Sequence, residues 1–503
     1  MSFTSLQFIF GFVPVAFIGF AFAHHFGGAK QAITLLATIS LVFYAMWGLP
    51  LLGILLVSMI FNFTVGNVVA NLSSNPRMAK NLLFGGIATN LAMLGYLKYT
   101  NFFIDVANQF SGGGFDHLSI VAPLGVSFFT FVQIGFLIDA SNGKLLPHRF
   151  SDYIVFSAFF PCVTAGPLVM QREMLEQLND PQFPVLDMRR VFIGITMFAM
   201  GLCKKVLFAD SIAPFADSVF GAAQHGATID AGTSWIGALS FTLQLYFDFS
   251  GYSDMAIGLG TIFGIKLPLN FDSPLKSTNI SDFWRRWHMT MTRFFTAYIY
   301  SGLAMHGVRS AMRWRLGRVG RFTLAAAVPS IVTFLFAGVW HGAGWTYIVY
   351  GLMHGLAIAT FLAWREFSGI KLPSPVAWLI TMVTVVCGLV MFRAPDVSTA
   401  MAMFGNMTAL SGFAQTGAVL AIDNAQALSM IVIMGAVALL LPNTQQFLHH
   451  EWPVIDTMPH DTPLVAGLIA WKPKLSSALL TALVLTAGIA SIGSSSGFLY
   501  YKF

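Results

Sequence analysis

The feature that most constrains this chain is a series of long windows without a charged side chain. A helix needs about 20 consecutive apolar residues to cross roughly 30 Å of hydrocarbon. Charged residues make up only 10% of the chain and hydrophobic ones 56%, whereas soluble domains carry roughly 25% charged residues. The charge-free windows are 2–29, 31–76, 117–138, 153–171, 322–364, 372–392, 397–422, 424–450 and 475–501. We therefore expect this chain to be solvated by lipid.

Two of the windows are long enough for a pair of helices. Because Gly and Pro punctuate helices, breaks are expected at Gly48-Leu49-Pro50 and at Gly342-Ala343-Gly344. Shorter candidate segments lie near 81–104, 191–209, 232–248 and 294–306. The total is on the order of eleven to fourteen segments, and re-entrant segments are compatible with the pattern. The predicted fold class is all-α, a polytopic transmembrane helical bundle.

A single membrane domain over residues 1–503 is expected, because no repeat, low-complexity tract or long polar linker divides the chain. The first window lacks a basic start and a small-residue cleavage site, so we interpret it as a retained helix rather than a signal peptide. The cysteines, Cys162, Cys203 and Cys387, show no metal-type spacing. They are typical of buried small hydrophobic residues, and no metal site is predicted.

The basic excess, 27 Lys and Arg against 21 Asp and Glu, gives a formal net charge of +6. In a membrane protein such an excess orients loops and does not indicate a nucleic acid partner. Arginines crowd the connection 309–321, and Lys144, His148 and Arg149 share another short connection. Both loops are expected to face the cytoplasm, because short loops rich in Lys and Arg resist translocation. Acidic residues contribute little to orientation, so the side of the acidic stretch 451–461 stays open.

His341 is the clearest candidate for catalysis. An ionisable group inside a membrane span is costly unless it is paired or faces a cavity, which makes it a functional hypothesis by default. His341 lies in the segment 336–345, FAGVWHGAGW, inside a charge-free window. An imidazole can take a proton from an alcohol near neutral pH, as acyl transfer to a hydroxyl requires, and the flanking glycines allow close approach of a helix or substrate. The alternative is a histidine that only hydrogen-bonds between helices.

A second group of candidates occupies the segment 279–288, NISDFWRRWH. The sequence predicts a short interfacial helix in which Ser281 is the N-cap and Asp282 lies in the first turn. Spacings of i, i+3 and i+4 place three ring-bearing side chains on one helical face. These are Trp284, Trp287 and His288.

Two arginines of the same segment, Arg285 and Arg286, point away from that face. They are suited to phosphate or phospholipid head groups, so membrane lipid or the donor is their expected contact. The alternative is a pure membrane-surface anchor, but an anchor has no need of the imidazole of His288.

A third group lies in the segment 244–254, QLYFDFSGYSD, where carboxylates and hydroxyls interrupt an apolar run. At membrane depth such a run must line protein or water rather than lipid. Asp248 or Asp254 is suited to orient a histidine or hold an arginine, with Tyr252 in a supporting role. Structural pairing within the bundle is the alternative.

His354 lies about 20 Å beyond His341 if the helix between them is continuous, too far for a dyad. We favour a packing or tunnel-lining role for His354. Phosphate-binding Gly-rich loops, dinucleotide fingerprints and Gly-x-Ser-x-Gly elbows are absent from the sequence. The chemistry is therefore expected to depend on His, Asp and backbone groups, without a bound cofactor.

The motifs together resemble the membrane-bound O-acyltransferase family, in its bacterial branch of alginate O-acetyltransferases and teichoic acid D-alanylation proteins. Order and spacing match over residues 121–355, the motif-dense core. The most specific matching segments are 246–254, 270–271, 283–288, 340–343 and Trp345, and further matches are 123–131, 159–161, 165–167 and 201–205. The C-terminal segments 392–395, 442–446 and 498–503 look like the exopolysaccharide branch.

The resemblance implies a helical bundle around a tunnel that crosses the membrane. The histidine that matches His341 is the catalytic residue in the family, and the one that matches His288 lies on the same path, with Trp340 beside it. Family members of this branch take an acyl group from a cytoplasmic thioester donor and commonly work with a separate periplasmic protein. One departure concerns the family's Arg-Asp-Tyr-Leu-Tyr-Ile-Pro run, of which residues 296–302 keep the tyrosines but lose the Arg-Asp pair and the Pro.

The sequence thus predicts an O-acetyltransferase of the bacterial inner membrane that modifies an alginate- or cellulose-like exopolysaccharide. Acetyl-CoA is the expected donor, a polysaccharide hydroxyl the acceptor, and an acetyltransferase- or esterase-like periplasmic protein the partner. His341 is expected to act as general base, with His288 and Asp248 positioning or polarising reactants. One alternative is D-alanyl or other acyl transfer from a carrier protein. Another is an export or transporter subunit, since polar residues at membrane depth also mark substrate pathways.

Overall fold

Helices make up the regular structure of the computed structural model, which describes residues 1–72, 74–184, 186–227, 229–408, 423–456, 471–493 and 497–499. Within these residues no strand occurs apart from two isolated bridges, Leu267 with Val454 and Phe271 with Trp287. The all-α prediction is confirmed. Some predicted regions fall partly outside the described residues, among them the charge-free windows 397–422 and 475–501, the C-terminal motif 498–503 and the acidic stretch 451–461.

The first half of the chain forms helices that are interrupted by π-helical turns, here labelled η1 to η3. Their bounds are η1 Phe8–Phe12, α1 Val13–Gly27, α2 Ala29–Ala45, α3 Leu49–Asn71, α4 Pro76–Leu94, η2 Gly95–Tyr99, α5 Thr100–Ser111, α6 Val126–Ser141, α7 Phe150–Ala158, α8 Gln171–Leu178, α9 Met188–Cys203, η3 Lys204–Ala209 and α10 Asp210–Gln224.

The second half begins with the longest described helix and contains several short ones near the predicted site; η4 is a 3₁₀ turn, and η5 and η6 are π-helical turns. Their bounds are α11 Ala231–Ile262, η4 Pro274–Lys276, α12 Ile280–Arg286, α13 Met289–Phe295, η5 Thr296–Tyr300, α14 Ser301–Arg313, α15 Arg318–Phe322, η6 Thr323–Ala327, α16 Val328–His341, α17 Trp345–Phe367, α18 Ser374–Arg393, α19 Val397–Met407, α20 Asn424–Leu440, α21 Thr444–Phe447 and α23 Leu475–Ala490.

Six helical segments of the described chain are long and apolar enough to cross a membrane: Phe8–Gly27, Leu49–Asn71, Met188–Gln224, Arg318–His341, Trp345–Phe367 and Ser374–Arg393. Four shorter apolar helices, α2, α6, α20 and α23, accompany them. Both predicted breaks are observed, since α3 begins at Leu49 and α17 begins at Trp345. The arrangement is that of a polytopic helical bundle.

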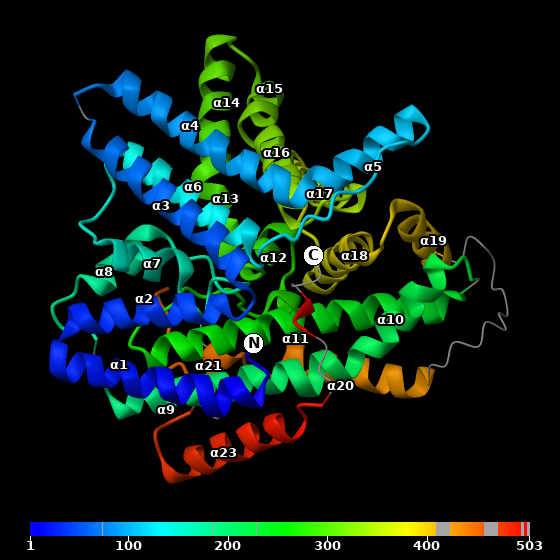
Figure 1. The fold of residues 1–503 in the computed structure, drawn as a ribbon. Helices are drawn as coiled ribbons and strands as arrows, with labels where there is room; N and C mark the ends of the chain where they lie inside the picture. Colours follow the sequence, from blue (N-terminus) through cyan, green and yellow to red (C-terminus); the bar gives the residue numbers. More distant parts are fainter. Residues whose placement is uncertain are drawn as a thin grey trace.

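Helix α11 lies inside the bundle and is buried along nearly its whole length. It packs against α9, α10, α18, α19 and α20. In Figure 1, α1, α2, α9 and α11 run across the lower half of the molecule, and α3, α4, α14 and α16 rise above them. Because protein rather than lipid surrounds α11, the polar side chains of the 244–254 segment can be satisfied inside the bundle.

Glycines allow α9 and α11 to approach backbone to backbone. A Cβ on Gly201 would lie 2.5 Å from the carbonyl oxygen of Gly251, and a Cβ on Gly194 would lie 2.6 Å from that of Gly258. Small residues at such contacts are typical of helix packing in membranes, where close van der Waals contact replaces the hydrophobic effect as a driving force.

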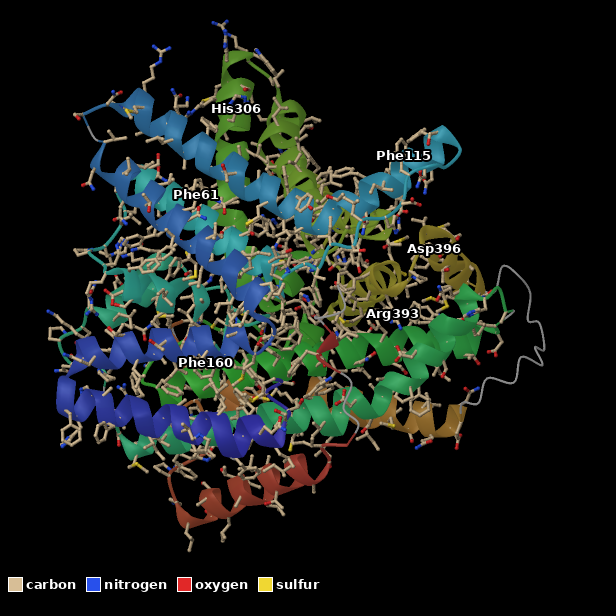
Figure 2. The ribbon with its side chains drawn as sticks, viewed as in Figure 1. Phe61, Phe115, Phe160, His306, Arg393 and Asp396 are labelled. Carbon is tan, nitrogen blue, oxygen red and sulfur yellow. The ribbon has the colours of Figure 1, made fainter. Side chains whose placement is uncertain are left out.

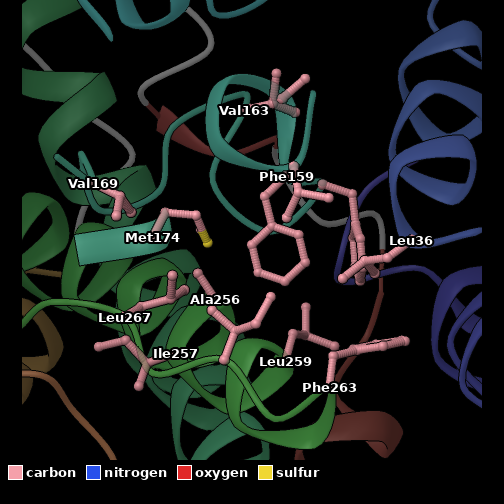
Figure 3. Packing of buried hydrophobic residues seen from close by; sticks show 14 of the residues in the cluster. Leu36, Phe159, Val163, Val169, Met174, Ala256, Ile257, Leu259, Phe263 and Leu267 are labelled. Carbon is pink, nitrogen blue, oxygen red and sulfur yellow. The ribbon is translucent and has the colours of Figure 1, made fainter. Parts of the chain in front are cut away.

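The two ends of α11 pack in different hydrophobic clusters. The cluster around its C-terminal half includes Phe159, Met174 and Leu259, and Figure 3 shows Phe159 at its centre with Met174 and Leu259 nearby. The other cluster contains Phe249, Trp284 and Trp340. This second cluster carries the predicted site.

Candidate active site

His341 is the last residue of α16, at the turn that leads back into α17. The two helices form a tight antiparallel pair, because a Cβ on Gly338 would lie 3.0 Å from the Cα of Gly351. The prediction that glycines beside His341 allow another helix to approach is therefore confirmed. The His341 side chain is buried, with 7% of the residue exposed.

His288 is buried even more completely, with 1% of the residue exposed. Its backbone adopts φ 45° and ψ 50°, a left-handed conformation that is uncommon for residues other than glycine. The conformation is held from the neighbouring loop, because Asn270 accepts a hydrogen bond from Nδ1 of His288 at 3.1 Å and its backbone carbonyl accepts one from Met289 N at 3.0 Å. Residues kept in such conformations cluster at functional sites.

Hydrogen bonding fixes the tautomer of His288. The side-chain oxygen of Asn270 also accepts from the hydroxyl of Thr290 at 2.9 Å, and Nδ2 of Asn270 donates to the hydroxyl of Ser253 at 3.0 Å. These partners distinguish the oxygen of the Asn270 amide from its nitrogen. An amide oxygen can only accept, so Nδ1 of His288 carries the proton. The basic nitrogen of the neutral ring is therefore Nε2.

The two candidate histidines lie close together although they belong to different elements. Their ring centres are 6.5 Å apart. The Trp340 ring is 5.9 Å from that of His288 and 4.9 Å from that of His341. The structure thus brings His288, His341 and Trp340 into one cluster, as the motifs predict.

The helix that carries Trp284 is shorter than the spacing argument requires. It ends at Arg286, so Trp287 is extended and His288 left-handed, and the prediction of one shared helical face is wrong. Its cap is Asn279 rather than Ser281, because the Asn279 side chain accepts from the backbone of Asp282 at 2.8 Å. Both tryptophans nevertheless point into the protein and are buried.

His354 is nearer to His341 than a continuous helix would place it, because the chain turns back after residue 341. The ring of Tyr350 lies 5.9 Å from that of His341 and 4.7 Å from that of His354. Trp284 donates through Nε1 to Nδ1 of His354 at 3.3 Å, and a Cβ on Gly388 of α18 would lie 2.3 Å from Nε2 of His354. His354 therefore joins α12, α17 and α18 behind the site.

Asp248 and Asp254 do not contact the histidines. Asp248 pairs with Lys205 at 2.7 Å and Asp254 with Lys204 at 2.6 Å, so the expectation that they orient a histidine or hold an arginine is wrong. The ring of Tyr252 lies 4.5 Å from that of Phe498, near the chain end. The two carboxylates miss the histidines because of their position around the axis of α11. The neighbouring face of the helix contacts the site, and the face that carries Asp248 and Asp254 does not.

That neighbouring face carries residues that sequence reasoning did not single out. The ring of Phe249 lies 4.7 Å from that of His288, and Ser253 holds Asn270. In the sequence, Asn270 is marked only by the matching segment 270–271. An Asn next to Phe271 in a polar stretch between apolar segments is the signal that could have found it.

Arg285 and Arg286 lie on the side of α12 that faces away from the histidines, as predicted. Both pair with Asp282, at 3.2 and 3.0 Å, but the Arg285 side chain is 70% exposed and that of Arg286 37%. A cavity of about 240 Å³ lies beside Trp284 and Arg285 and continues between α13, α16 and α17. An exposed cationic group beside a partly polar cavity is suited to an anionic group.

A residue after the motif-dense core also reaches the site. The ring of Phe392, at the end of α18, lies 5.2 Å from that of His341. Its neighbour Arg393, labelled in Figure 2, pairs with Asp217 of α10 at 2.7 Å and so anchors this helix end. The C-terminal motif 392–395 therefore contributes to the wall behind His341.

A second cavity, of about 150 Å³, opens directly onto His341. Its lining includes Lys98, Ser127, Thr164 and Trp340. Lys98 was not among the predicted site residues, since a single lysine in the segment 81–104 looks like the end of a span. In the structure, its Nζ lies 2.9 Å from the backbone oxygen of His341.

Comparison with known proteins shows similarity over most of the chain. The sequence model described as MBOAT, membrane-bound O-acyltransferase family, matches residues 138–404. The chain is 37% identical over 442 residues to the peptidoglycan O-acetyltransferase of Helicobacter pylori, covering 82% of this chain and 80% of that protein. It is 36% identical over 412 residues to the probable alginate O-acetylase AlgI of Pseudomonas aeruginosa, covering 81% of this chain and 75% of that protein.

A more distant similarity extends to cell-wall alanylation. The teichoic acid D-alanyltransferase of Lacticaseibacillus rhamnosus is 28% identical over 288 residues, covering 56% of this chain and 66% of that protein. The O-acetyltransferases thus match more of the chain, at higher identity.

Proposed function

The chain belongs to the membrane-bound O-acyltransferase family, in its bacterial O-acetyltransferase branch, and we propose that it passes an acetyl group from a cytoplasmic thioester donor across the membrane to an exopolysaccharide. It is a multi-pass membrane O-acyltransferase. The observation that carries the proposal is the pair of buried imidazoles, His288 and His341, 6.5 Å apart inside a helical bundle.

The proposed reaction needs one base near the acyl carbon. His341 takes the proton of the incoming hydroxyl as that oxygen bonds to the acetyl carbonyl carbon. The carbon–sulfur bond then breaks, the ester stays on the acceptor, and the thiolate receives the proton from the imidazolium. His288, with Nδ1–H bound to Asn270, offers Nε2 to position or polarise a reactant. The Trp340 ring packs against both imidazole rings.

Acetyl-CoA is the proposed donor and a polysaccharide hydroxyl the final acceptor. The names of the relatives support an acetyl group and a polymer, since one acts on peptidoglycan and the other is named for alginate. The C-terminal motifs favour an alginate- or cellulose-like exopolysaccharide. The proposed location is the bacterial inner membrane, where a periplasmic acetyltransferase- or esterase-like protein receives the acetyl group.

A second candidate is D-alanyl transfer from a carrier protein, which the similarity to the teichoic acid D-alanyltransferase favours. One experiment separates the two. The full chain is purified, reconstituted in liposomes, and supplied either with [¹⁴C]acetyl-CoA or with a D-[¹⁴C]alanyl carrier protein. The proposed periplasmic partner and a polysaccharide are added to the liposomes. The release of free thiol and the label in the polysaccharide are then measured. Turnover of acetyl-CoA alone supports our proposal, whereas turnover of the alanyl carrier alone replaces it with the second candidate.

A further inference from the structure

Lys98 and Tyr99 together bind the end of the helix that carries His341. Nζ of Lys98 donates to the backbone oxygens of Trp340 at 2.8 Å and of His341 at 2.9 Å. The hydroxyl of Tyr99 donates to the backbone oxygen of Val339. Three successive carbonyls of α16 are thus held by two adjacent residues, here called the Lys98–Tyr99 clamp.

The end of α16 requires such partners. The last four carbonyls of a helix have no intrahelical N–H donor, and they are usually satisfied by a C-cap or by water. Here Gly342 is extended, with φ −161° and ψ 158°, and the structure gives it no capping backbone bond. The negative end of the helix dipole also favours a cation. A lysine from another helical segment satisfies both needs at once.

The lysine has no hydrogen-bonding capacity left for a substrate. An ammonium group has three N–H donors, and Lys98 uses the third on Oγ of Ser127 at 3.2 Å. The backbone oxygen of Ser127 in turn accepts from Nε1 of Trp340 at 3.3 Å. Lys98, Ser127 and Trp340 therefore form a closed set of contacts around the backbone of His341, beside the 150 Å³ cavity.

We propose that the Lys98–Tyr99 clamp positions His341 for acyl transfer. The inference rests on the proposed function, because it gives the clamp a role in the reaction at His341. Lys98 acts through the backbone and does not itself touch the reacting atoms. Since a misplacement of about 1 Å can lower a rate about 10²-fold, loss of the clamp affects turnover more than binding.

The test uses the full-length protein in liposomes with Lys98→Met, which keeps most of the length of the side chain and removes its donors. Acetyl-CoA turnover is expected to lose about 10- to 100-fold in kcat with KM within about twofold of the parent. Lys98→Arg, which retains donors for the carbonyls, is expected to recover part of the rate. The matched control is Lys80→Met, an exposed lysine on α4, which should leave both constants unchanged.

A second readout does not depend on the reaction. Diethylpyrocarbonate modification of His341, followed by peptide mass spectrometry, is expected to be several-fold faster in Lys98→Met than in the parent. If the parent turns over no acetyl-CoA but this difference appears, the proposed function fails and the clamp stands. An unchanged kcat with unchanged labelling overturns the clamp, and so does a raised KM with an unchanged kcat. Should Lys98→Met not fold, Tyr99→Phe removes one of the three carbonyl contacts, and the same readouts decide.

Discussion

The imidazole rings of His288 and His341 lie 6.5 Å apart in the buried interior, one at the start of α13 and the other at the end of α16. Each is held by a partner from another part of the chain. Asn270 accepts from the ring of His288 and from the backbone of Met289, and Lys98 donates to the backbone oxygen of His341. Catalytic groups that are fixed in this way do not need to be reorganised when the substrate arrives.

Replacing Asn270 by Ala is expected to lower acyl transfer by about 10- to 100-fold, because His288 loses its Nδ1 partner and Thr290 loses a side-chain acceptor. Removing one partner of buried hydrogen bonds should also lower the free energy of unfolding by about 1–3 kcal/mol. Turnover in liposomes and thermal unfolding in detergent measure the two effects. Asn67→Ala, which breaks only a bond to its own helix, is the control. Full activity of Asn270→Ala would show that His288 needs no such anchor.

Trp284→Phe should lower activity by a smaller factor, about 3- to 10-fold, since it keeps the buried ring but removes the hydrogen bond to His354. Trp284→Ala and Trp287→Ala should lower the activity further, because each leaves a cavity in the wall beside His288 into which the imidazole ring can move. The corresponding control is Trp364→Phe, whose indole bonds a surface carbonyl. Intact turnover in the tryptophan variants would exclude a role for this wall.

Arg285→Ala should act on KM rather than kcat, because its side chain is exposed and its bond is to Asp282 of the same helix.

The sequence predicted the fold class and the helix breaks because they depend on local properties. Charge-free windows define helices that lipid can surround, and the Gly and Pro clusters at residues 48–50 and 342–344 end them. The histidine motifs could be recognised for the same reason, since each is a short contiguous segment. Whether His288 and His341 are the catalytic residues stays a prediction.

The contacts that complete the site could not be predicted, because they join distant parts of the chain. Lys98 and His341 are separated by 243 positions, and no local pattern marks that pair. The direction of Asp248 depends on the rotation of α11 within the bundle, where a shift of one residue turns a side chain by about 100°. The end of α12 at Arg286 is likewise set by Asn270, which holds the following backbone in a conformation that helical spacing does not anticipate.

The connection 309–321 is expected to face the cytoplasm, because short loops dense in arginine resist translocation. The structure adds a second position to this test. Arg318 pairs with Glu366 at 2.9 Å, so the end of α17 and the following Lys371 lie on the same side. In a background without the three native cysteines, Arg315→Cys and Lys371→Cys should react with a membrane-impermeant maleimide only in inverted vesicles. Labelling of either in intact spheroplasts would contradict the assigned orientation.

His341→Asn separates catalysis from packing most directly. The amide keeps a hydrogen-bonding group of similar reach, so the variant is expected to insert, purify and unfold like the parent, with the Lys98–Tyr99 clamp on the backbone intact. An amide cannot accept a proton near neutral pH, and loss of general-base catalysis typically lowers a rate 10²–10⁴-fold. We therefore expect His341→Asn to fail to acetylate polymer in cells and to lose acyl transfer from purified donor by at least about 10²-fold. A histidine that only packs between helices would tolerate Asn with partial function. Normal acetylation by a well-expressed His341→Asn protein would remove the catalytic assignment and favour an export role for this chain.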